Sequence, residues 1–198
     1  MKISIATEDI LTEEILIKII SSLDNISIPH KLGKQGSGFL LNSLQKLNEL
    51  SRAHHVIAIF DLDLKPDAEE FKSLLENKIT NKTQTFNIII SVREIESWIL
   101  ADREGFSEYL SISKEKICRA PDELLDPKEK IISLARLSKI SDIKKGIPPK
   151  KGAAAKVGLS YNSLLSNFIR DKWDSERASK YSPSLLKALH HINNIENS

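Results

Sequence analysis

The sequence predicts an α/β protein: a mostly parallel sheet flanked by helices, followed by a helical C-terminal extension. Residues 55–60 and 86–92 are free of acidic, lysine and arginine side chains, as expected for strands that are covered on both faces. Segments with the apolar spacing of helices alternate with these strands, which implies crossover connections and parallel pairing. No strong strand pattern follows residue 92, so the rest of the chain is expected to be helical.

The composition is that of an ordinary globular protein. With 198 residues, 40% of them apolar and 28% charged, the chain suits one domain, or one domain with an extension. Cys118 is the single cysteine, which excludes an intrachain disulfide and fits a reducing compartment. Residues 1–10 lack the long apolar stretch of a signal peptide, and no segment approaches the roughly 20 apolar residues of a membrane span. We therefore expect a soluble, cytoplasmic protein without membrane contact.

Local signals place the elements of the first half. Glu13 and Glu14 suit the first turn of a helix that Thr12 would cap. Gly33 begins the sequence GKQGSGF, a flexible loop that could approach a phosphate closely. It lacks the lysine-serine ending of a P-loop, so a plain connection is the other interpretation. The expected elements are a strand at 2–7, the helix after Thr12, a strand at 26–30, a helix at 40–50, a strand at 55–60, a helix from Asp67 to about 79 and a strand at 86–92.

The second half is expected to contain short helices and one basic loop. The helices are predicted at 104–110, 113–118, 128–138, 160–172 and 183–192, with the turn-rich loop at 141–158. Tyr161 and Trp173 are expected to pack among the last helices rather than to act in chemistry.

Charge is distributed unevenly along the chain. Residues 1–127 carry 15 Lys and Arg against 21 Asp and Glu, a net of −6, whereas residues 128–198 carry 14 against 6, a net of +8. Such asymmetry indicates a negatively charged partner, of which nucleic acid is the commonest. The alternative is that the two parts of the chain have solvated surfaces whose opposite charges balance each other.

Acidic residues follow three of the predicted strands. Glu8 follows the first strand, Asp61 and Asp63 follow the central one, and Glu94 and Glu96 follow the last. In open α/β sheets, functional groups collect at the carboxyl ends of the strands. Alternate residues of an extended segment point the same way, so the two aspartates are expected to face one site. The alternative is that these acids cap helices or end strands in water, as we expect for Asp67.

A divalent cation would remove the repulsion between such carboxylates. Mg²⁺ prefers hard oxygen ligands and keeps several waters, and a pair of such ions could clamp the attacking and leaving oxygens of a phosphodiester. The five histidines show no metal-ligand spacing with cysteine, so nothing favours zinc.

The orientation of Glu94 and Glu96 depends on the local structure. Both face one way if the strand continues, and they diverge by about 200° if a helix begins at Glu94. In such a helix Trp98 lies on the apolar face and is expected in the core. Asp102 would contact the site or pair with Arg93 or Arg103.

These residues resemble the toprim domain of topoisomerases, primases and the overcoming-lysogenization-defect nucleases. The shared features are the glutamate after the first strand, the DxD after the central strand and a further acidic element. The segment EIESWILAD, which begins at Glu94, is similar to the E-x-E-x-W-L-L-A-D signature of small toprim-like proteins encoded near ATPases in bacterial anti-phage loci. The resemblance covers roughly residues 1–105 and implies a toprim-like domain there. Residues 106–198 are expected to form a basic helical extension or cap.

The resemblance also implies a chemistry. It implies Mg²⁺, with Mn²⁺ as the other candidate ion, bound by Glu8, Asp61 and Asp63 with Glu96 or Glu94 as a further ligand, and it implies phosphodiester cleavage or strand transfer. Many toprim domains have glycine after the first glutamate, where this chain has Asp9, which puts the local geometry in doubt and offers another ligand. No tyrosine is placed as a nucleophile, which favours water.

The predicted basic loop would bind the nucleic-acid backbone. Lysines on a loop suit phosphate contacts, which position a substrate without reading its sequence. Lys156 or Lys145 would also stabilise charge on the scissile phosphate. A merely solvated loop is the alternative. The expected nucleic-acid-binding residues are Lys144, Lys145, Lys150, Lys151 and Lys156.

The first functional hypothesis is a metal-dependent endonuclease of DNA or RNA, acting in anti-phage defence. Its expected catalytic residues are Glu8, Asp61, Asp63, Glu96 and Lys156, and its expected partners are nucleic acid and an ATPase protein, with a homo-oligomer left open. The second hypothesis is a non-catalytic binding or regulatory subunit of an ATPase-linked defence complex, with a degenerate site. A small-molecule phosphotransferase is disfavoured, because no P-loop is present.

Overall fold

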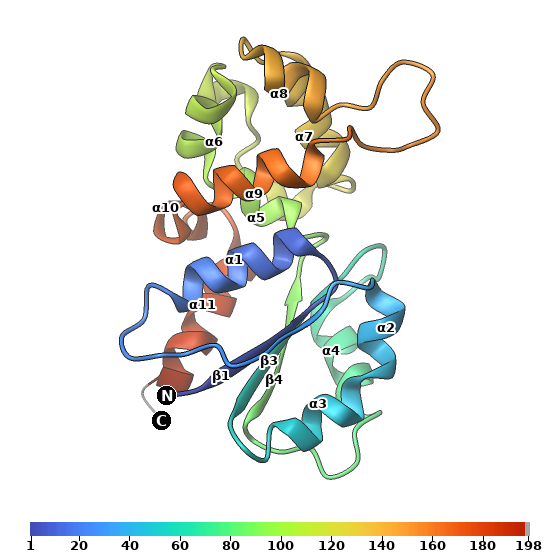
Figure 1. Ribbon diagram of the computed structural model, residues 1–198, viewed down its shortest axis with the longest axis vertical. Helices are drawn as coiled ribbons and strands as arrows, with labels where there is room; N and C mark the ends of the chain where they lie inside the picture. The colour runs from blue at the N-terminus through green and yellow to red at the C-terminus, as the bar shows by residue number, and fades with distance from the viewer. Residues whose placement is uncertain (197–198) are drawn as a thin grey trace. The chain divides into compact units, whose positions relative to one another are not determined.

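The computed structural model describes residues 1–196 and divides into two compact units. The first unit comprises Met1–Val92 together with the chain from Lys187 onward, and the second comprises Arg93–Leu186. The first boundary lies before the one expected at residue 105, and the last helix returns to the first unit (Figure 1). Each unit is described below by itself.

The first unit is built on a parallel sheet, which confirms the predicted α/β class. Its strands are β1 (Ile3–Thr7), β2 (Lys31–Gly33), β3 (His55–Asp61) and β4 (Phe86–Ser91), in the order β2-β1-β3-β4. All three neighbouring pairs are parallel. The register pairs Thr7 with Ile59 and Asp61 with Ser91, so the carboxyl ends of the strands share one edge of the sheet.

Helices cover both faces of this sheet (Figure 1). One face carries α2 (Ser37–Asn42), α3 (Leu44–Leu50) and α4 (Ala68–Glu76), and the other carries α1 (Ile10–Ile20) and the C-terminal part of α11 (Pro183–Glu196). On the first face Leu47, Phe60 and Phe71 belong to one buried apolar cluster. On the second face, the ring Nε2 of His191 lies 2.8 Å from Oδ1 of Asn87 and joins α11 to β4.

The second strand lies later in the chain than predicted. β2 covers Lys31–Gly33 rather than 26–30, and in the earlier segment only Ser27 forms an isolated bridge, with Lys2. Pro29 has no N–H to donate to a ladder, so regular pairing begins after it. Gly33 ends the strand at φ +100°, and a Cβ there would lie 2.0 Å from the backbone oxygen of Thr7. Only glycine allows this approach.

Two helix starts in the first unit test the predicted caps. Asp67 caps α4 by accepting from the N–H of Glu70 at 2.8 Å, as expected. The prediction that Thr12 caps α1 is wrong, because the helix begins at Ile10 and Asp9 accepts from the N–H of Thr12 at 2.9 Å. The Thr12 hydroxyl donates to the same carboxylate, at 3.0 Å.

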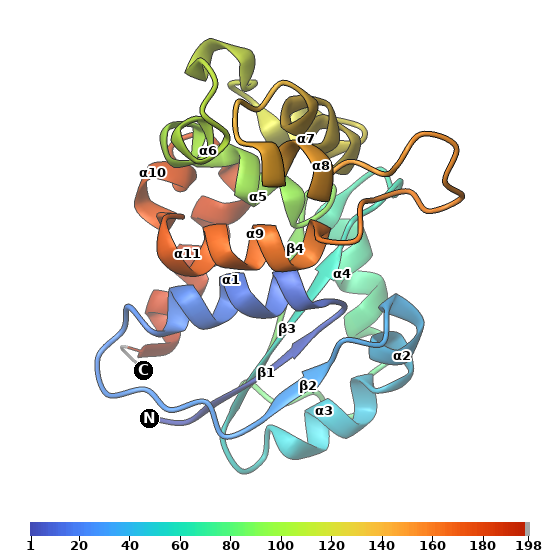
Figure 2. The same ribbon diagram turned by 45° about the horizontal axis from the view of Figure 1, so that its top comes forward.

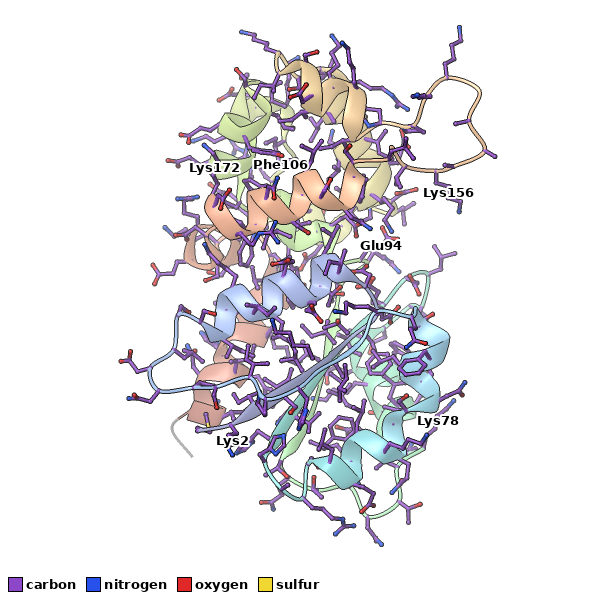
Figure 3. The ribbon with its side chains drawn as sticks, viewed as in Figure 1. Lys2, Lys78, Glu94, Phe106, Lys156 and Lys172 are labelled. Carbon is purple, nitrogen blue, oxygen red and sulfur yellow. The ribbon has the colours of Figure 1, made fainter. Side chains whose placement is uncertain are left out.

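Every regular element of the second unit is a helix. Its helices are α5 (Glu96–Ala101), α6 (Arg103–Leu110), η1 (Lys114–Lys116), η2 (Pro121–Glu123), α7 (Pro127–Arg136), α8 (Ser141–Gly146), α9 (Tyr161–Asp171), α10 (Ser175–Ser179) and the start of α11. Trp98, Trp173 and Phe106 are fully buried, and Figure 3 labels Phe106 among the helices of this unit. Phe106 packs edge-on to Phe168, with ring centroids 5.2 Å apart. The expected core positions of Trp98 and Trp173 are confirmed.

The basic loop is shorter than predicted. Residues 141–146 form α8 because Ile143 is buried and anchors a helical turn, and the loop proper runs from there to α9. Sequence patterns also missed η2 and α10, which are only three and five residues long.

Within the described residues no helix is both long and apolar enough to cross a membrane.

Candidate functional site

The carboxyl edge of the sheet brings the first acidic residues together. Glu8 directly follows β1, and its Oε1 accepts a hydrogen bond from the backbone N–H of Asp61 at 3.2 Å. This bond joins two residues predicted to act together although 53 positions separate them in the chain. It can form because β1 and β3 are neighbours and Thr7, the last residue of β1, pairs with Ile59, two residues before β3 ends.

Glu8 is an unusual carboxylic acid. Its pKa is raised from 4.5 to about 7, mainly by burial and also by the negative charges of Asp63 and Asp9. The hydrogen bond from Asp61 and the charge of Lys65 act in the opposite direction. A buried carboxyl group with like charges around it is destabilised in its ionised form. Strongly shifted groups of this kind collect at functional sites.

Asp61 is held firmly at the end of β3. The residue is 9% exposed, and its Oδ1 accepts a short hydrogen bond from the hydroxyl of Ser91 at the end of β4. The backbone N–H of Leu62 also donates to the Ser91 carbonyl, at 2.9 Å. Ser91 therefore fixes Asp61, a role that the sequence did not suggest.

Asp63 does not continue the strand. Its φ is +52°, so the argument that Asp61 and Asp63 point the same way along an extended segment is wrong at Asp63. Its side chain is half exposed and lies 3.6 Å from the ammonium of Lys65. Asp63 is nevertheless close enough to Glu8 to raise the pKa of Glu8.

Lys65 brings a positive charge to the same edge. Its ammonium lies 4.1 Å from the centre of the Phe71 ring and donates to the Leu62 carbonyl at 3.3 Å. The sequence analysis did not single it out. The available signal was its position two residues after the DxD, inside a turn that leads back to α4.

Asp9 and the glycine loop have structural roles at this edge. Asp9 is the cap of α1, which gives the carboxylate after Glu8 a structural role. Gly36 donates its N–H to the Glu8 carbonyl at 3.0 Å, and Lys34 donates its N–H to the Thr7 carbonyl at 2.9 Å. The loop is thus pinned against the end of β1. The side chain of Lys34 pairs with the buried Glu13 at 3.1 Å.

Glu94 and Glu96 belong to the second unit, where a lysine lies between them. β4 ends at Ser91 and α5 begins at Glu96, so neither a continued strand nor a helix from Glu94 describes this segment. The ammonium of Lys128 lies 3.2 Å from Glu94 and 3.5 Å from Glu96. Glu96 is 1% exposed and accepts from the hydroxyl of Tyr161 at 2.9 Å. Their role as metal ligands stays a prediction.

Asp102 is engaged elsewhere in the second unit. The residue is fully buried, and both of its oxygens accept from the Arg177 guanidinium at 2.8 Å. It also caps α6 through the N–H of Gly105 at 3.1 Å. The expected pairing with Arg93 or Arg103 is therefore replaced by a partner 75 positions away.

The five lysines expected to bind nucleic acid are all exposed. Lys144 and Lys145 lie on α8, and the other three lysines lie on the loop that joins α8 to α9. This loop extends away from the helices of the second unit in both ribbon views (Figure 2). Lys156 extends from this loop (Figure 3). The lysines on the loop are Lys150, Lys151 and Lys156.

Residues 1–196 contain no close group of three or more His, Cys, Asp or Glu side chains of the kind that holds a metal ion. In the first unit Glu8 accepts from the backbone of Asp61 and is close enough to Asp63 for its pKa to be raised by that charge. Their donor atoms are carboxylate oxygens, which is the chemistry that Mg²⁺ prefers. Metal binding at this edge stays a prediction.

Comparison with known proteins gives one family. The model of a domain of unknown function, DUF4276, matches residues 6–161, a range that contains every predicted site residue from Glu8 to Lys156. No curated protein and no solved structure matches the chain.

Proposed function

This chain belongs to the DUF4276 family, and we propose that it is a Mg²⁺-dependent nucleic-acid phosphodiesterase, a toprim-like endonuclease of anti-phage defence. The observation that carries the proposal is the state of Glu8. Its partly buried carboxyl group touches Asp61 at the carboxyl edge of a parallel sheet and has its pKa raised to about 7. Such a group gains stability when a cation neutralises it.

Glu8, Asp61 and Asp63 are the residues that would hold the ion. All three offer oxygen ligands, and the rise of the Glu8 pKa through burial and the charge of Asp63 means that a divalent ion would relieve an existing cost. Mg²⁺ fits because it takes few carboxylates and keeps waters, and Mn²⁺ shares this preference for oxygen ligands. When bound, the ion supplies Lewis-acid polarisation of a phosphoryl oxygen.

The remaining residues would orient the substrate. Lys65, beside Asp63, presents an ammonium that would neutralise charge on a phosphodiester near the carboxylates. The exposed lysines of the second unit would bind the backbone through phosphate contacts, and Lys156 or Lys145 would also stabilise charge on the scissile phosphate. Water would serve as the nucleophile, since the Tyr161 hydroxyl already donates to Glu96 and no sequence signal activates Tyr181.

A cleavage assay tests the proposal. The full chain is incubated with plasmid, single-stranded DNA and tRNA in Mg²⁺, Mn²⁺ or EDTA, and wild type is compared with Asp61→Asn and Asp24→Asn. Asparagine keeps an oxygen for the Ser91 hydroxyl, so Asp61→Asn tests charge rather than packing. We expect metal-dependent cleavage that falls at least about 100-fold in Asp61→Asn, the scale for losing one preorganised electrostatic contact. Asp24 is exposed, and its variant is expected to cleave as wild type does.

The contrary outcome is equally definite. A folded wild-type protein that cleaves none of these substrates in either ion, or an Asp61→Asn variant that cleaves normally, would overturn the proposal. The binding or regulatory subunit of an ATPase-linked complex would then be the better hypothesis, and co-purification with an ATPase encoded nearby would be its first test.

A further inference from the structure

A hollow of about 450 Å³ lies beside the basic loop of the second unit. Its volume is in the range of sites that bind small organic groups. Apolar side chains of Pro148, Val157 and Leu159 line it, with Lys145 and Lys150 among the polar lining residues. The metal-dependent function proposed above does not require such a hollow, since lysines alone would bind phosphates.

The base of the loop is fixed, so the hollow is already formed. The N–H of Gly158 donates to the Ile147 carbonyl at 2.8 Å, and the N–H of Ser160 donates to the Gly146 carbonyl at 3.1 Å. A Cβ on Gly158 would lie 2.1 Å from the Gly146 oxygen, so the two ends of the loop touch through their backbones. The loop therefore leaves and rejoins the helices at one tightly packed point.

The lining combines an apolar wall with positive charge. Leu159 is 96% exposed and offers an apolar contact to a ligand. Lys145 and Lys150 are both exposed. A ligand that satisfies this lining has an apolar surface and a negative charge close together. The carboxylate of Asp142, which also lines the hollow, adds an acceptor for an amino group.

We propose that this hollow takes one unpaired nucleotide of a single-stranded nucleic acid. The face of the base would lie on Leu159 and Val157, and the adjoining phosphates would contact Lys145 and Lys150. In a duplex the base faces are covered by their neighbours, whereas single strands expose them for contact with protein side chains. The inference rests on the proposed function in so far as it names that enzyme's substrate class: single-stranded segments rather than continuous duplex.

The test is a binding measurement without metal. Fluorescence anisotropy of the full chain in EDTA compares a labelled oligonucleotide that cannot pair with itself against the duplex formed with its complement. We expect the single strand to bind at least 10-fold more tightly. The double variant Lys145→Ala, Lys150→Ala should lose most of this preference.

A matched control separates the hollow from general charge. Lys144 and Lys151 are exposed neighbours of the two lining lysines and do not line the hollow. The double variant Lys144→Ala, Lys151→Ala removes the same charge, so it should weaken single-strand and duplex binding by similar factors and keep the preference. Leu159→Ser should weaken single-strand binding by about 4-fold or more, the effect of losing the burial of a single CH₂ group. It should leave the salt dependence unchanged, because no charge is altered.

Three results would each overturn the inference. These are equal binding of single strand and duplex by wild type, equal effects of the two double-lysine variants on the preference, and an unchanged single-strand affinity in Leu159→Ser. Since EDTA removes divalent ions, none of them depends on cleavage. A chain that binds the single strand in EDTA but never cleaves it in Mg²⁺ or Mn²⁺ would contradict the proposed enzyme and leave the ligand assigned to the hollow intact.

Discussion

The Glu8 carboxylate accepts the backbone N–H of Asp61 at 3.2 Å, and this contact places an acid with a raised pKa at the end of the central strand. The hydrogen bond favours the ionised form of Glu8, yet burial and nearby negative charge outweigh it. Ionisation of Glu8 is therefore expected to link pH to the stability of this molecule.

The first prediction concerns pH. The pKa of Glu8 lies near 4.5 in the unfolded chain and about 7 in the folded one, so the folded state holds the proton more tightly. Its contribution to stability is fully present below pH 4.5 and is lost as pH rises through about 7. We expect Glu8→Gln to remove this decline from urea-unfolding curves recorded between pH 4.5 and 8 without divalent ions. Glu108→Gln, at an exposed position, should retain it; identical curves for wild type and Glu8→Gln would contradict the assignment.

The second prediction concerns metal binding. Metal ligands must be deprotonated, and at pH 7 a group with a pKa of about 7 is about half protonated. Binding of Mg²⁺ or Mn²⁺ should therefore release about half a proton. Calorimetry in two buffers of different ionisation enthalpy measures this number directly. Glu8→Gln should release none, and the Asp61→Ala, Asp63→Ala double variant should not bind; binding by wild type without proton release would exclude Glu8 as a ligand.

The third prediction concerns Gly105 in α6. A Cβ at this position would lie 2.4 Å from an Asp102 oxygen and 2.8 Å from the Arg177 guanidinium, so Gly105→Ala must displace a buried ion pair. We expect a loss of about 1–3 kcal/mol in the free energy of unfolding, the usual cost of overpacking. Gly38→Ala is the matched control, because nothing lies within 4 Å of a Cβ there and alanine favours the helix. Urea unfolding followed by circular dichroism compares them, and equal effects would show that the Asp102 pocket tolerates a methyl group.

The fourth prediction concerns the hydrogen bond between Tyr161 and Glu96. The hydroxyl of Tyr161 donates a hydrogen bond to Glu96, whose side chain is 1% exposed. Tyr161→Phe therefore removes one hydrogen-bond donor from a buried carboxylate. The expected cost is about 1–3 kcal/mol in unfolding free energy. Tyr181→Phe, at a partly exposed ring, should cost much less. If the two variants have the same stability, the contact with Glu96 contributes nothing to folding.

Strand and cap signals that act over a few residues could be read from the sequence. The central strand and the strand at 86–92 depend on apolar runs, and both are present in the structure. The cap at Asp67 depends on a carboxylate three residues before the backbone N–H that it accepts from, and this bond is also present. The two errors in placing elements also have local causes. Asp9, and not Thr12, caps the first helix, and the second strand begins after Pro29 and not before it.

The sequence by itself determined the parallel α/β class and placed Glu8, Asp61 and Asp63 at strand ends, because apolar runs and their polar ends are local properties of the chain. Only the tertiary structure decided their surroundings: the Ser91 hydroxyl on Asp61, Lys128 between Glu94 and Glu96, and Arg177 on Asp102. Each of these partners lies at least 30 positions away along the chain. Burial and charge neutralisation arise only once the chain is packed, and no pattern of neighbouring residues specifies which distant side chain will provide them.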